Sequence, residues 1–300
     1  YIDRKKLTIS KGKHSVSCYD IAQYYDNKPL DVASESIGII LDQKYLEIKK
    51  KREIFSKFYY SRHKREIRAY CIEDCRLTKE LSEYWIAIFE AVFGFYPNNW
   101  ISAGYLAEKV LINNNIQIPL FNELPYPVQE IARKSFYGGR FELIKRGFIG
   151  ECYLYDINSA YPHALTNLLE IRNGRWLEST KIHPKVKIGF FYIEANVSTE
   201  VKIAPFPFVK KNRTICYPSG KFRTFVTLDE LLMVKDDPEI SYTIIESWQF
   251  IPKNNSYPFK KFIEEQYYQR LKLKQENNPL EKAIKIVLNS IYGKMAQRTN

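Results

Sequence analysis

The spacing of hydrophobic positions changes along the chain and divides it into regions of different secondary structure. Residues 1 to 48 predict short strands and turns followed by a helix. A basic run at 49–68 leads into apolar residues at helical spacing, which predict a long amphipathic helix over residues 63 to 93. FYPNNW (95–100) interrupts this pattern, because Pro and Asn favour turns, and marks the best candidate for a domain boundary.

After this boundary the pattern predicts another helix, two loops and a sheet. SAGYLAEKVLINN predicts a helix that starts from Ser102, whose hydroxyl suits an N-cap. NELPYPVQE (122–130) predicts a proline-rich linker, and SFYGGRFE (135–142) a Gly-Gly turn. Apolar and polar residues then alternate in short runs from 150 to 250, which is typical of a β-sheet.

Helical spacing returns at Tyr257. FKKFIEEQYYQRLKLKQE and PLEKAIKIVLNSIYGKMAQ predict helices separated by NNP, with Pro279 at the start of the second one. The short turn between them predicts an antiparallel helical hairpin. The chain as a whole is therefore predicted to be α+β.

Composition favours a globular protein with a polyanionic partner. The chain has 300 residues, 45% of them hydrophobic, which is enough for a sizeable core in two domains or one large one. Its 46 Lys and Arg against 34 Asp and Glu give a net charge of +12, which favours nucleic acid or an anionic membrane. The membrane is the weaker choice, because the longest apolar region (84–96) is too short to span a bilayer and contains Glu90. No signal peptide is visible at the start.

The cysteines indicate the kind of cellular compartment in which the protein works. They are scattered along the chain and odd in number, which favours a reducing, intracellular setting; they lie at positions 18, 71, 75, 152 and 216. No second Cys or His pair completes a zinc site with Cys71 and Cys75, so we expect both to be reduced, partly buried thiols. The chain has no initiating Met, so we expect it to be processed or an internal piece of a longer protein.

The last predicted helix carries the most informative pattern. Its apolar stripe comprises Ile284, Val287, Leu288 and Ile291. A second face comprises Lys282, Lys285, Asn289 and Tyr292, with Gly293 beside it. A solvated face with long lysines is the ordinary alternative. The combination favours a nucleotide, because lysine complements phosphate charge, tyrosine stacks on a base and glycine leaves room.

A second candidate site lies in YDINSAYP (155–162). Cys152 to Tyr155 predict a buried strand, Asp156 follows at its end, and Tyr161 is held by Pro162 in the next turn. Asp156 or Ser159 could simply be the N-cap of the helix that starts near Pro162. Alternatively, a carboxylate fixed at a strand end suits a divalent cation in phosphoryl transfer.

These two segments resemble motifs of the family B DNA polymerases. KIVLNSIYG (285–293) is similar to motif B, K-x-x-x-N-S-x-Y-G. DINSAYP (156–162) is similar to motif A, D-x-x-S-L-Y-P, with Ala160 where Leu is usual. Both motifs occur in the expected order, which makes the resemblance specific.

Weaker resemblances extend over nearly the whole chain. FYGGR (136–140) resembles the Y-x-G-G motif between the exonuclease and polymerase domains, with Phe136 where Tyr is usual. YCIED (70–74) resembles the third exonuclease motif, Y-x-x-x-D, and residues 18–38 resemble the stretch that leads up to it. For YCIED, ordinary surface charge is the alternative explanation.

The resemblance implies a role for individual residues. Asp156 would be catalytic and bind metal, Tyr161 would exclude a 2′-hydroxyl from the sugar site, and Lys285 would bind the triphosphate. Nucleotide binding would involve Ile157, Ser159, Tyr161, Arg270, Lys285, Asn289 and Tyr292. DNA would contact Phe136, Gly138, Gly139, Gly293 and Lys294. In the exonuclease site, Tyr70 would orient water beside a metal-bound Asp74, one helical turn away.

The implied architecture is the C-terminal part of an RNase H-like 3′–5′ exonuclease domain (1–95), a connecting helix and linker (96–140), a palm (141–256) and a fingers hairpin (257–300). The long interval between motifs A and B is similar to that of the protein-primed subgroup of viruses, linear plasmids and organelles. The implied cofactors are two Mg²⁺ ions, with Mn²⁺ as a substitute. The implied partners are template-primer DNA, deoxynucleotides and a terminal protein primer, bound by a monomer.

Three parts of the family pattern are not found: motif C, the thumb, and the D-x-E motif that opens the exonuclease domain. Asp229 in LDELLMV predicts an ordinary helix start rather than a substitute for motif C. We therefore expect the chain alone to bind DNA in a salt-dependent way without extending a primer, and its gene to continue into paired aspartates. A decayed polymerase that only binds DNA, or a free-standing nuclease, is the alternative.

Overall fold

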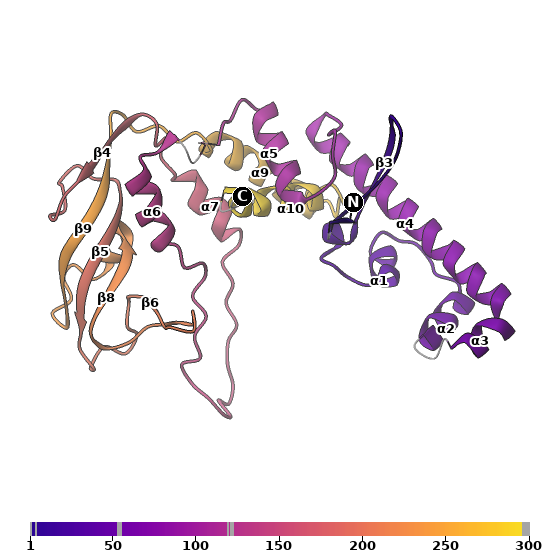
Figure 1. Cartoon of the computed structure of the whole chain (residues 1–300), viewed down its shortest axis with the longest axis horizontal. Helices are drawn as coiled ribbons and strands as arrows, with labels where there is room; N and C mark the ends of the chain where they lie inside the picture. The colour runs from indigo at the N-terminus through magenta and orange to yellow at the C-terminus, as the bar shows by residue number, and fades with distance from the viewer. Residues whose placement is uncertain (1, 4, 53–55, 119, 121–122, 296–300) are drawn as a thin grey trace. The chain divides into compact units, whose positions relative to one another are not determined.

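The structure is a computed structural model that describes residues 2–3, 5–52, 56–118, 120 and 123–295. Contacts within the chain divide it into two compact units (Figure 1). The first unit comprises Tyr1–Ile118, Ser159–Thr166 and Phe259–Asn300, and the second comprises Pro119–Asn158 and Asn167–Pro258. Helices and antiparallel sheets both occur, so the predicted α+β class is confirmed.

The first unit begins with a small sheet and short helices. Its strands are antiparallel in the order β1 (Ile2–Asp3), β2 (Lys6–Lys11) and β3 (His14–Tyr19). The 3₁₀ helix η1 (Ala22–Tyr25) and the helices α1 (Leu30–Glu35), α2 (Gln43–Lys51) and α3 (Lys57–Arg62) follow. The predicted strands, turns and helix of this region are confirmed.

The long amphipathic helix is α4 (Lys64–Phe93), as predicted. Its buried residues recur at helical spacing: Ile67, Leu77, Leu81, Trp85, Ile88 and Phe89. The Trp85 ring stacks on that of Tyr24 at 4.7 Å. The helix ends at Gly94, whose φ of +72° is a left-handed conformation that glycine adopts without strain.

Four further helices complete the described part of the first unit: α5 (Ala103–Asn113), α7 (Ala160–Thr166), α9 (Lys260–Gln275) and α10 (Glu281–Met295). The Ser102 hydroxyl accepts a hydrogen bond from the Tyr105 N–H at 3.1 Å, which confirms the predicted N-cap. The predicted apolar stripe of α10 is buried. It packs chiefly against α5, while α9 and α10 form the predicted hairpin. None of the described helices is long and apolar enough to cross a membrane.

The second unit is built on an antiparallel sheet of order β4-β9-β5-β8, as the alternating pattern predicts. Its strands are β4 (Gly174–Glu178), β5 (Ile188–Val197), β8 (Gly220–Thr227) and β9 (Ile240–Pro252). A β6 (Phe208–Val209) and β7 (Ile215–Cys216) pair and the helices α6 (Tyr126–Lys134) and α8 (Leu228–Met233) accompany it. The core of this unit comprises Phe191, Ile193, Ala195, Val197, Phe206, Val226, Leu228 and Leu231, with Ala204 and Val234.

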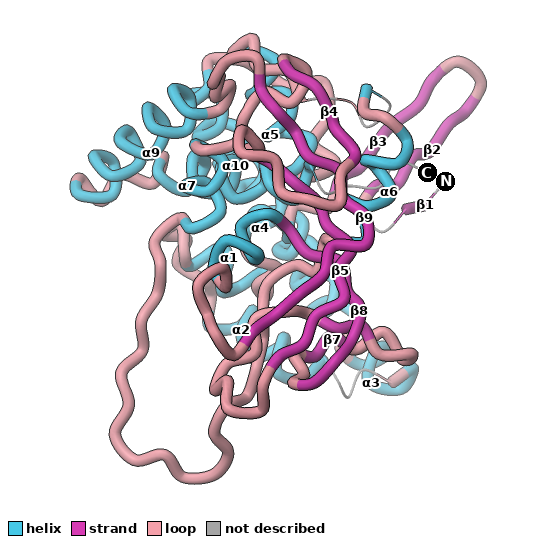
Figure 2. The backbone as a smooth tube through the Cα atoms, turned by 90° about the vertical axis from the view of Figure 1, so that its left-hand side faces the viewer, coloured by secondary structure: helices cyan, strands magenta, loops and turns pink. Residues whose placement is uncertain are grey.

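The predicted strand over Cys152 to Tyr155 is wrong. The segment between α6 and α7 is an exposed loop (Figure 2), in which Leu154 is 99% exposed. A strand needs a neighbour that pairs with its N–H and C=O groups. No described strand pairs with this segment. Asp156 therefore lies in a loop and not at the end of a strand.

Two smaller predictions also need correction. The proline-rich linker at 122–130 is partly helical, because α6 begins at Tyr126 with a proline in its first turn, where a missing N–H does no harm. Cys71 and Cys75 are exposed rather than partly buried, since they lie on the solvent side of α4. All five cysteines are free, which agrees with reduced thiols.

Candidate functional site

The polar face of α10 divides into free and engaged side chains. Lys285 and Asn289 are exposed. Lys282 instead donates from Nζ to the backbone oxygen of Ser36 at 3.3 Å. The charge that α10 leaves available is therefore that of Lys285, beside the Asn289 amide.

An aromatic pair joins α7 to α10. The rings of Tyr161 and Tyr292 stack with centroids 4.5 Å apart and planes inclined by 27°. Burial raises the pKa of Tyr292, and the nearby Tyr161 adds to this shift. Tyr161 is still 49% exposed. The pair thus presents a held aromatic surface, assembled from segments far apart in the sequence.

A polar chain links the turn before α7 to the α9–α10 hairpin. Ser159 has a φ of +55°, in the left-handed region. Its hydroxyl accepts a hydrogen bond from Arg270 Nη1 at 3.2 Å. Arg270 Nε donates to Glu281 Oε2 at 3.1 Å. Arg270, predicted to bind the nucleotide, is therefore anchored on two sides.

Gly293 and Lys294 follow on α10. A Cβ added at Gly293 would meet nothing within 4 Å, so packing among the described residues does not require a glycine there. That freedom fits a role in leaving room for a ligand. The ammonium of Lys294 lies 2.7 Å from Glu108 Oε2 on α5. Its charge is therefore already paired, and the DNA contact of Lys294 stays a prediction.

The second unit holds the remaining predicted polymerase residues. Asp156 and Ile157 are exposed in the loop, and Asp156 makes no hydrogen bond or ion pair with any described residue. Phe136 is 55% exposed. Gly138 has a φ of +75°, which explains a glycine there, and Gly139 follows it in the turn.

Two residues that sequence reasoning missed anchor this Gly-Gly turn to strand β8 and to neighbouring loops of the second unit. The Tyr137 hydroxyl donates to the Phe225 backbone oxygen at 2.9 Å. Arg140 lies over the Tyr217 ring at 3.8 Å and donates to the Ala204 backbone oxygen at 2.9 Å. The turn is therefore held from both sides.

Tyr70 and Asp74 lie one turn apart on α4, as predicted, and α2 adds a partner. The Tyr45 hydroxyl donates to Asp74 Oδ1 at 2.8 Å, and the Tyr45 ring stacks on Tyr70 at 5.0 Å. Burial raises the pKa of Tyr70, Asp74 adds to this, and Arg52 opposes it. No local spacing reveals Tyr45, because its contact with Asp74 is tertiary.

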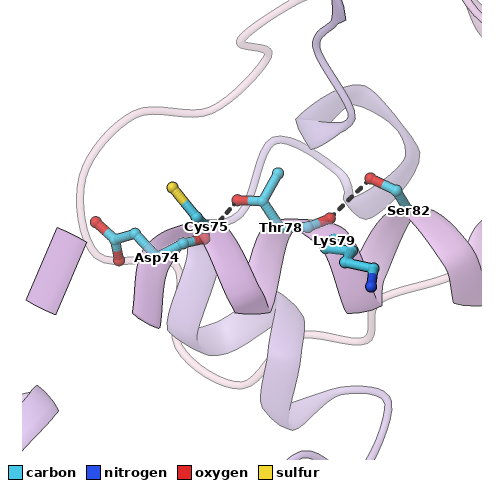
Figure 3. Close-up of a pocket in the computed structure, with 5 residues that line it drawn as sticks. All are labelled: Asp74, Cys75, Thr78, Lys79 and Ser82. Atoms are coloured by element: carbon cyan, nitrogen blue, oxygen red, sulfur yellow. Dashed lines mark hydrogen bonds between the residues drawn. The ribbon is translucent and has the colours of Figure 1, made fainter. Parts of the chain in front are cut away.

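Asp74 also lines a shallow pocket on α4 with Cys75, Thr78, Lys79 and Ser82 (Figure 3). The hydroxyls of Thr78 and Ser82 donate to backbone oxygens of their own helix, at 2.8 and 2.7 Å. They are therefore engaged by the helix, and Asp74 and Lys79 are the charged groups of the pocket.

The described residues do not complete a metal site. No group of three or more His, Cys, Asp or Glu is placed to hold an ion in the described part of the chain. Asp74 and Asp156 each offer a single carboxylate, whereas Mg²⁺ takes about six oxygen ligands. No chemical step through a metal can be built from these residues alone.

Comparisons with known proteins agree with this arrangement. The family described as DNA polymerase type B, organellar and viral, matches residues 2–300. The DNA polymerase of Acidianus bottle-shaped virus (isolate Italy/Pozzuoli) is 26% identical over 95% of this chain and 44% of its own length. The DNA-directed DNA polymerase of Enterobacteria phage PRD1 is 25% identical over 98% of this chain and 48% of its own length.

Solved structures show the same fold. Phi29 DNA polymerase superposes with a TM-score of 0.64 and 17% identity, over 96% of this chain and 50% of that one. Its complex with primer-template DNA gives a TM-score of 0.62 at 16% identity, with the same coverage. The chain thus spans about half the length of these relatives. On the match over residues 2–300, it belongs to the type B DNA polymerases of the organellar and viral group.

Proposed function

We propose that this chain is part of a template-directed DNA polymerase that adds deoxynucleotides to a primer 3′-hydroxyl during DNA replication. Family membership supports this function. The observation that carries it is the stack of Tyr161 on Tyr292 at 4.5 Å, because within the first unit it brings a residue of the motif A-like segment against a residue of the motif B-like segment. Neither a binding remnant nor a free nuclease needs that juxtaposition.

The exposed groups of this unit suit a deoxynucleotide. Lys285 offers a point charge for the triphosphate. Tyr161 is rigidly held by its stack, so its ring can exclude a 2′-hydroxyl. Asn289 and Tyr292 on the same helix would line the nascent base pair. The basic chain, with a net charge of +12, suits template-primer DNA.

Family B DNA polymerases generally use divalent metal ions. In our proposal Asp156 contributes one carboxylate to their binding, and Ile157 its backbone carbonyl. Two Mg²⁺ ions are the proposed complement, with Mn²⁺ as a substitute. The further ligands are not among the described residues.

We also propose the domain boundaries: part of an exonuclease domain at 1–95, a connecting segment at 96–140, a palm at 141–256 and a fingers hairpin from 257. Residues 296–300 of that hairpin lie outside the described residues. Protein priming, which the long interval between the two motifs favours, and a monomeric state belong to the same proposal.

A 3′–5′ exonuclease is the second proposed activity. The hydrogen bond from Tyr45 to Asp74 at 2.8 Å favours it, because a fixed carboxylate in an accessible pocket is suited to ligand binding. Tyr70 is stacked beside it and could orient a water molecule.

The test of the polymerase function is Asp156→Asn in the full-length gene product. We expect nucleotide incorporation to fall by about a thousandfold or more, as for other essential catalytic groups, with DNA affinity unchanged. Asp229→Asn is the matched control, another exposed aspartate, at the start of α8. Near-normal primer extension by the Asp156 variant would overturn the assignment.

A further inference from the structure

Glu281 is an unexpected residue in a site for an anionic ligand. It lies in the first turn of α10, four residues before Lys285 and eight before Asn289. These spacings place the three on one helix face. A free carboxylate there would repel a triphosphate, so its presence needs an explanation.

Arg270 supplies that explanation. Its Nε lies 3.1 Å from Glu281 Oε2, and both side chains are largely buried, at 17% and 21% exposure. At such sites solvent and salt screen an ion pair less than at the open surface. The carboxylate charge is thus directed at the guanidinium and away from Lys285.

The guanidinium is held at a second point. Nη1 of Arg270 donates to the Ser159 hydroxyl at 3.2 Å. A guanidinium is planar and carries five N–H groups, so two anchors on different nitrogens fix its plane and leave Nη2 for another acceptor. Ser159 lies two residues before Tyr161, the candidate sugar contact, so this edge of Arg270 is fixed against the turn that precedes that residue.

We propose that Glu281 is a positioning residue: it holds Arg270 against the Ser159 turn so that the free Nη2 edge binds a phosphate of the incoming deoxynucleotide. This inference rests on the proposed polymerase function and adds a residue outside both resembling motifs. Glu281 acts through Arg270 and does not touch the nucleotide.

The competing explanations predict a different change in nucleotide affinity when Glu281 is removed, either in its direction or in its dependence on Arg270. If Glu281 competed with phosphate for Arg270, its removal would tighten nucleotide binding. If it only tied α9 to α10, its removal would lower stability, and any effect on nucleotide binding would not depend on Arg270. If Glu281 positions Arg270, its removal weakens nucleotide binding, and this effect is absent in a variant that already lacks Arg270.

The experiment is a double-mutant cycle in the full-length gene product with Glu281→Ala, Arg270→Ala and both together. The measurements are the dissociation constant of a fluorescently labelled dATP and the KM and kcat of dATP incorporation. We expect Glu281→Ala to weaken binding about tenfold, the scale of one hydrogen bond to a charged group, chiefly through KM. The double variant should bind like Arg270→Ala alone.

Two further variants guard against misfolding. Glu281→Gln keeps a hydrogen-bond acceptor for Arg270 Nε, so it should retain most of the affinity that Glu281→Ala loses. Glu265→Ala removes an exposed carboxylate of α9 that pairs with Lys261, and it should change nothing. Unfolding midpoints of all variants are measured in parallel.

Tighter binding in Glu281→Ala, or effects of the two alanine variants that simply add, would overturn the inference. An unchanged dATP affinity in Arg270→Ala would overturn it too, and would also remove Arg270 from the proposed nucleotide site. Failure of the wild-type protein to extend a primer would instead refute the proposed function.

Discussion

Tyr161 carries the most specific chemistry of any single residue in the chain. Its ring is stacked on Tyr292 and half exposed, so it has little freedom to move away from a bulky sugar. Tyr161→Val removes the ring and should raise the ratio of ribonucleotide to deoxyribonucleotide incorporation by at least about tenfold, equivalent to ~1.4 kcal/mol. Single-nucleotide extension with each substrate measures the ratio. Tyr96→Val, at another exposed tyrosine, serves as the control, and an equal ratio in both variants would make Tyr161 a packing residue.

A substitution at Asp74 tests the proposed 3′–5′ exonuclease activity through a single residue. Asp74→Ala leaves the Tyr45 hydroxyl without its acceptor and removes the proposed carboxylate ligand. We expect 3′–5′ degradation of a primer to fall by about a hundredfold or more while extension persists. Glu83→Ala, on the same helix and paired with Lys79 at 3.6 Å, should alter neither activity. Loss of both activities in the Asp74 variant would indicate a folding defect.

Residues with a local signal were the ones that the sequence could identify. Tyr161, Lys285 and Tyr292 lie in ordered motifs, and the structure brings Tyr161 and Tyr292 together. Tyr45 and Glu281 could not be identified, because their roles depend on contacts between helices. Spacing along one helix says nothing of a partner on another.

Helices and strands differ in the same way, because some have a local sequence signal and others depend on contacts with distant parts of the chain. The helices α4, α5 and α10 follow from apolar periodicity, and Ser102 marks one start correctly. The strand predicted over Cys152 to Tyr155 fails because strand pairing is not a local property. A helix satisfies its own backbone hydrogen bonds, whereas an apolar run becomes a strand only beside a partner.

The helix α8 allows a prediction about pH. Thr227 and Glu230 form a capping box, in which the Glu230 carboxylate accepts from the Thr227 N–H at 2.7 Å. Burial raises the pKa of Glu230 above its ordinary value of 4.5, although the bonds from Thr227 oppose this. The folded state therefore binds the proton more tightly, so this group's contribution to stability is lost as pH rises from 4.5 through the folded pKa.

Glu230→Gln keeps the acceptor and removes the charge. It should raise the free energy of unfolding at pH 7, and the gain should shrink as pH falls toward 4.5, because the folded state takes up a proton on Glu230 more readily than the unfolded state does. Urea unfolding at several pH values measures the difference. Glu200→Gln, at an exposed site of the same unit, should show no such trend. A gain independent of pH, or a loss at pH 7, would contradict the burial of this charge.

At the scale of the whole molecule, the loop between α6 and α7 (Figure 2) has the most exposed apolar side chains among the described residues. Phe141, Phe148 and Leu154 are 95%, 97% and 99% exposed. Its backbone forms no helix or strand from 141 to 158, so few hydrogen bonds must open before a protease can bind. The other apolar stretches of comparable length lie in α4, α5, α10 and the sheet, where side chains are buried.

We therefore expect chymotrypsin to cut the 300-residue chain first between Phe141 and Tyr155, at low protease ratios where the rest stays intact. Mass spectrometry of the earliest fragments locates the cut. A variant with Phe141, Phe148, Tyr153, Leu154 and Tyr155 replaced by serine should resist this first cut and unfold at the same temperature, because exposed side chains contribute little to folding. A first cut within α4 or the β4-β9-β5-β8 sheet, or a large loss of stability in the serine variant, would mean that this loop is covered by the protein itself.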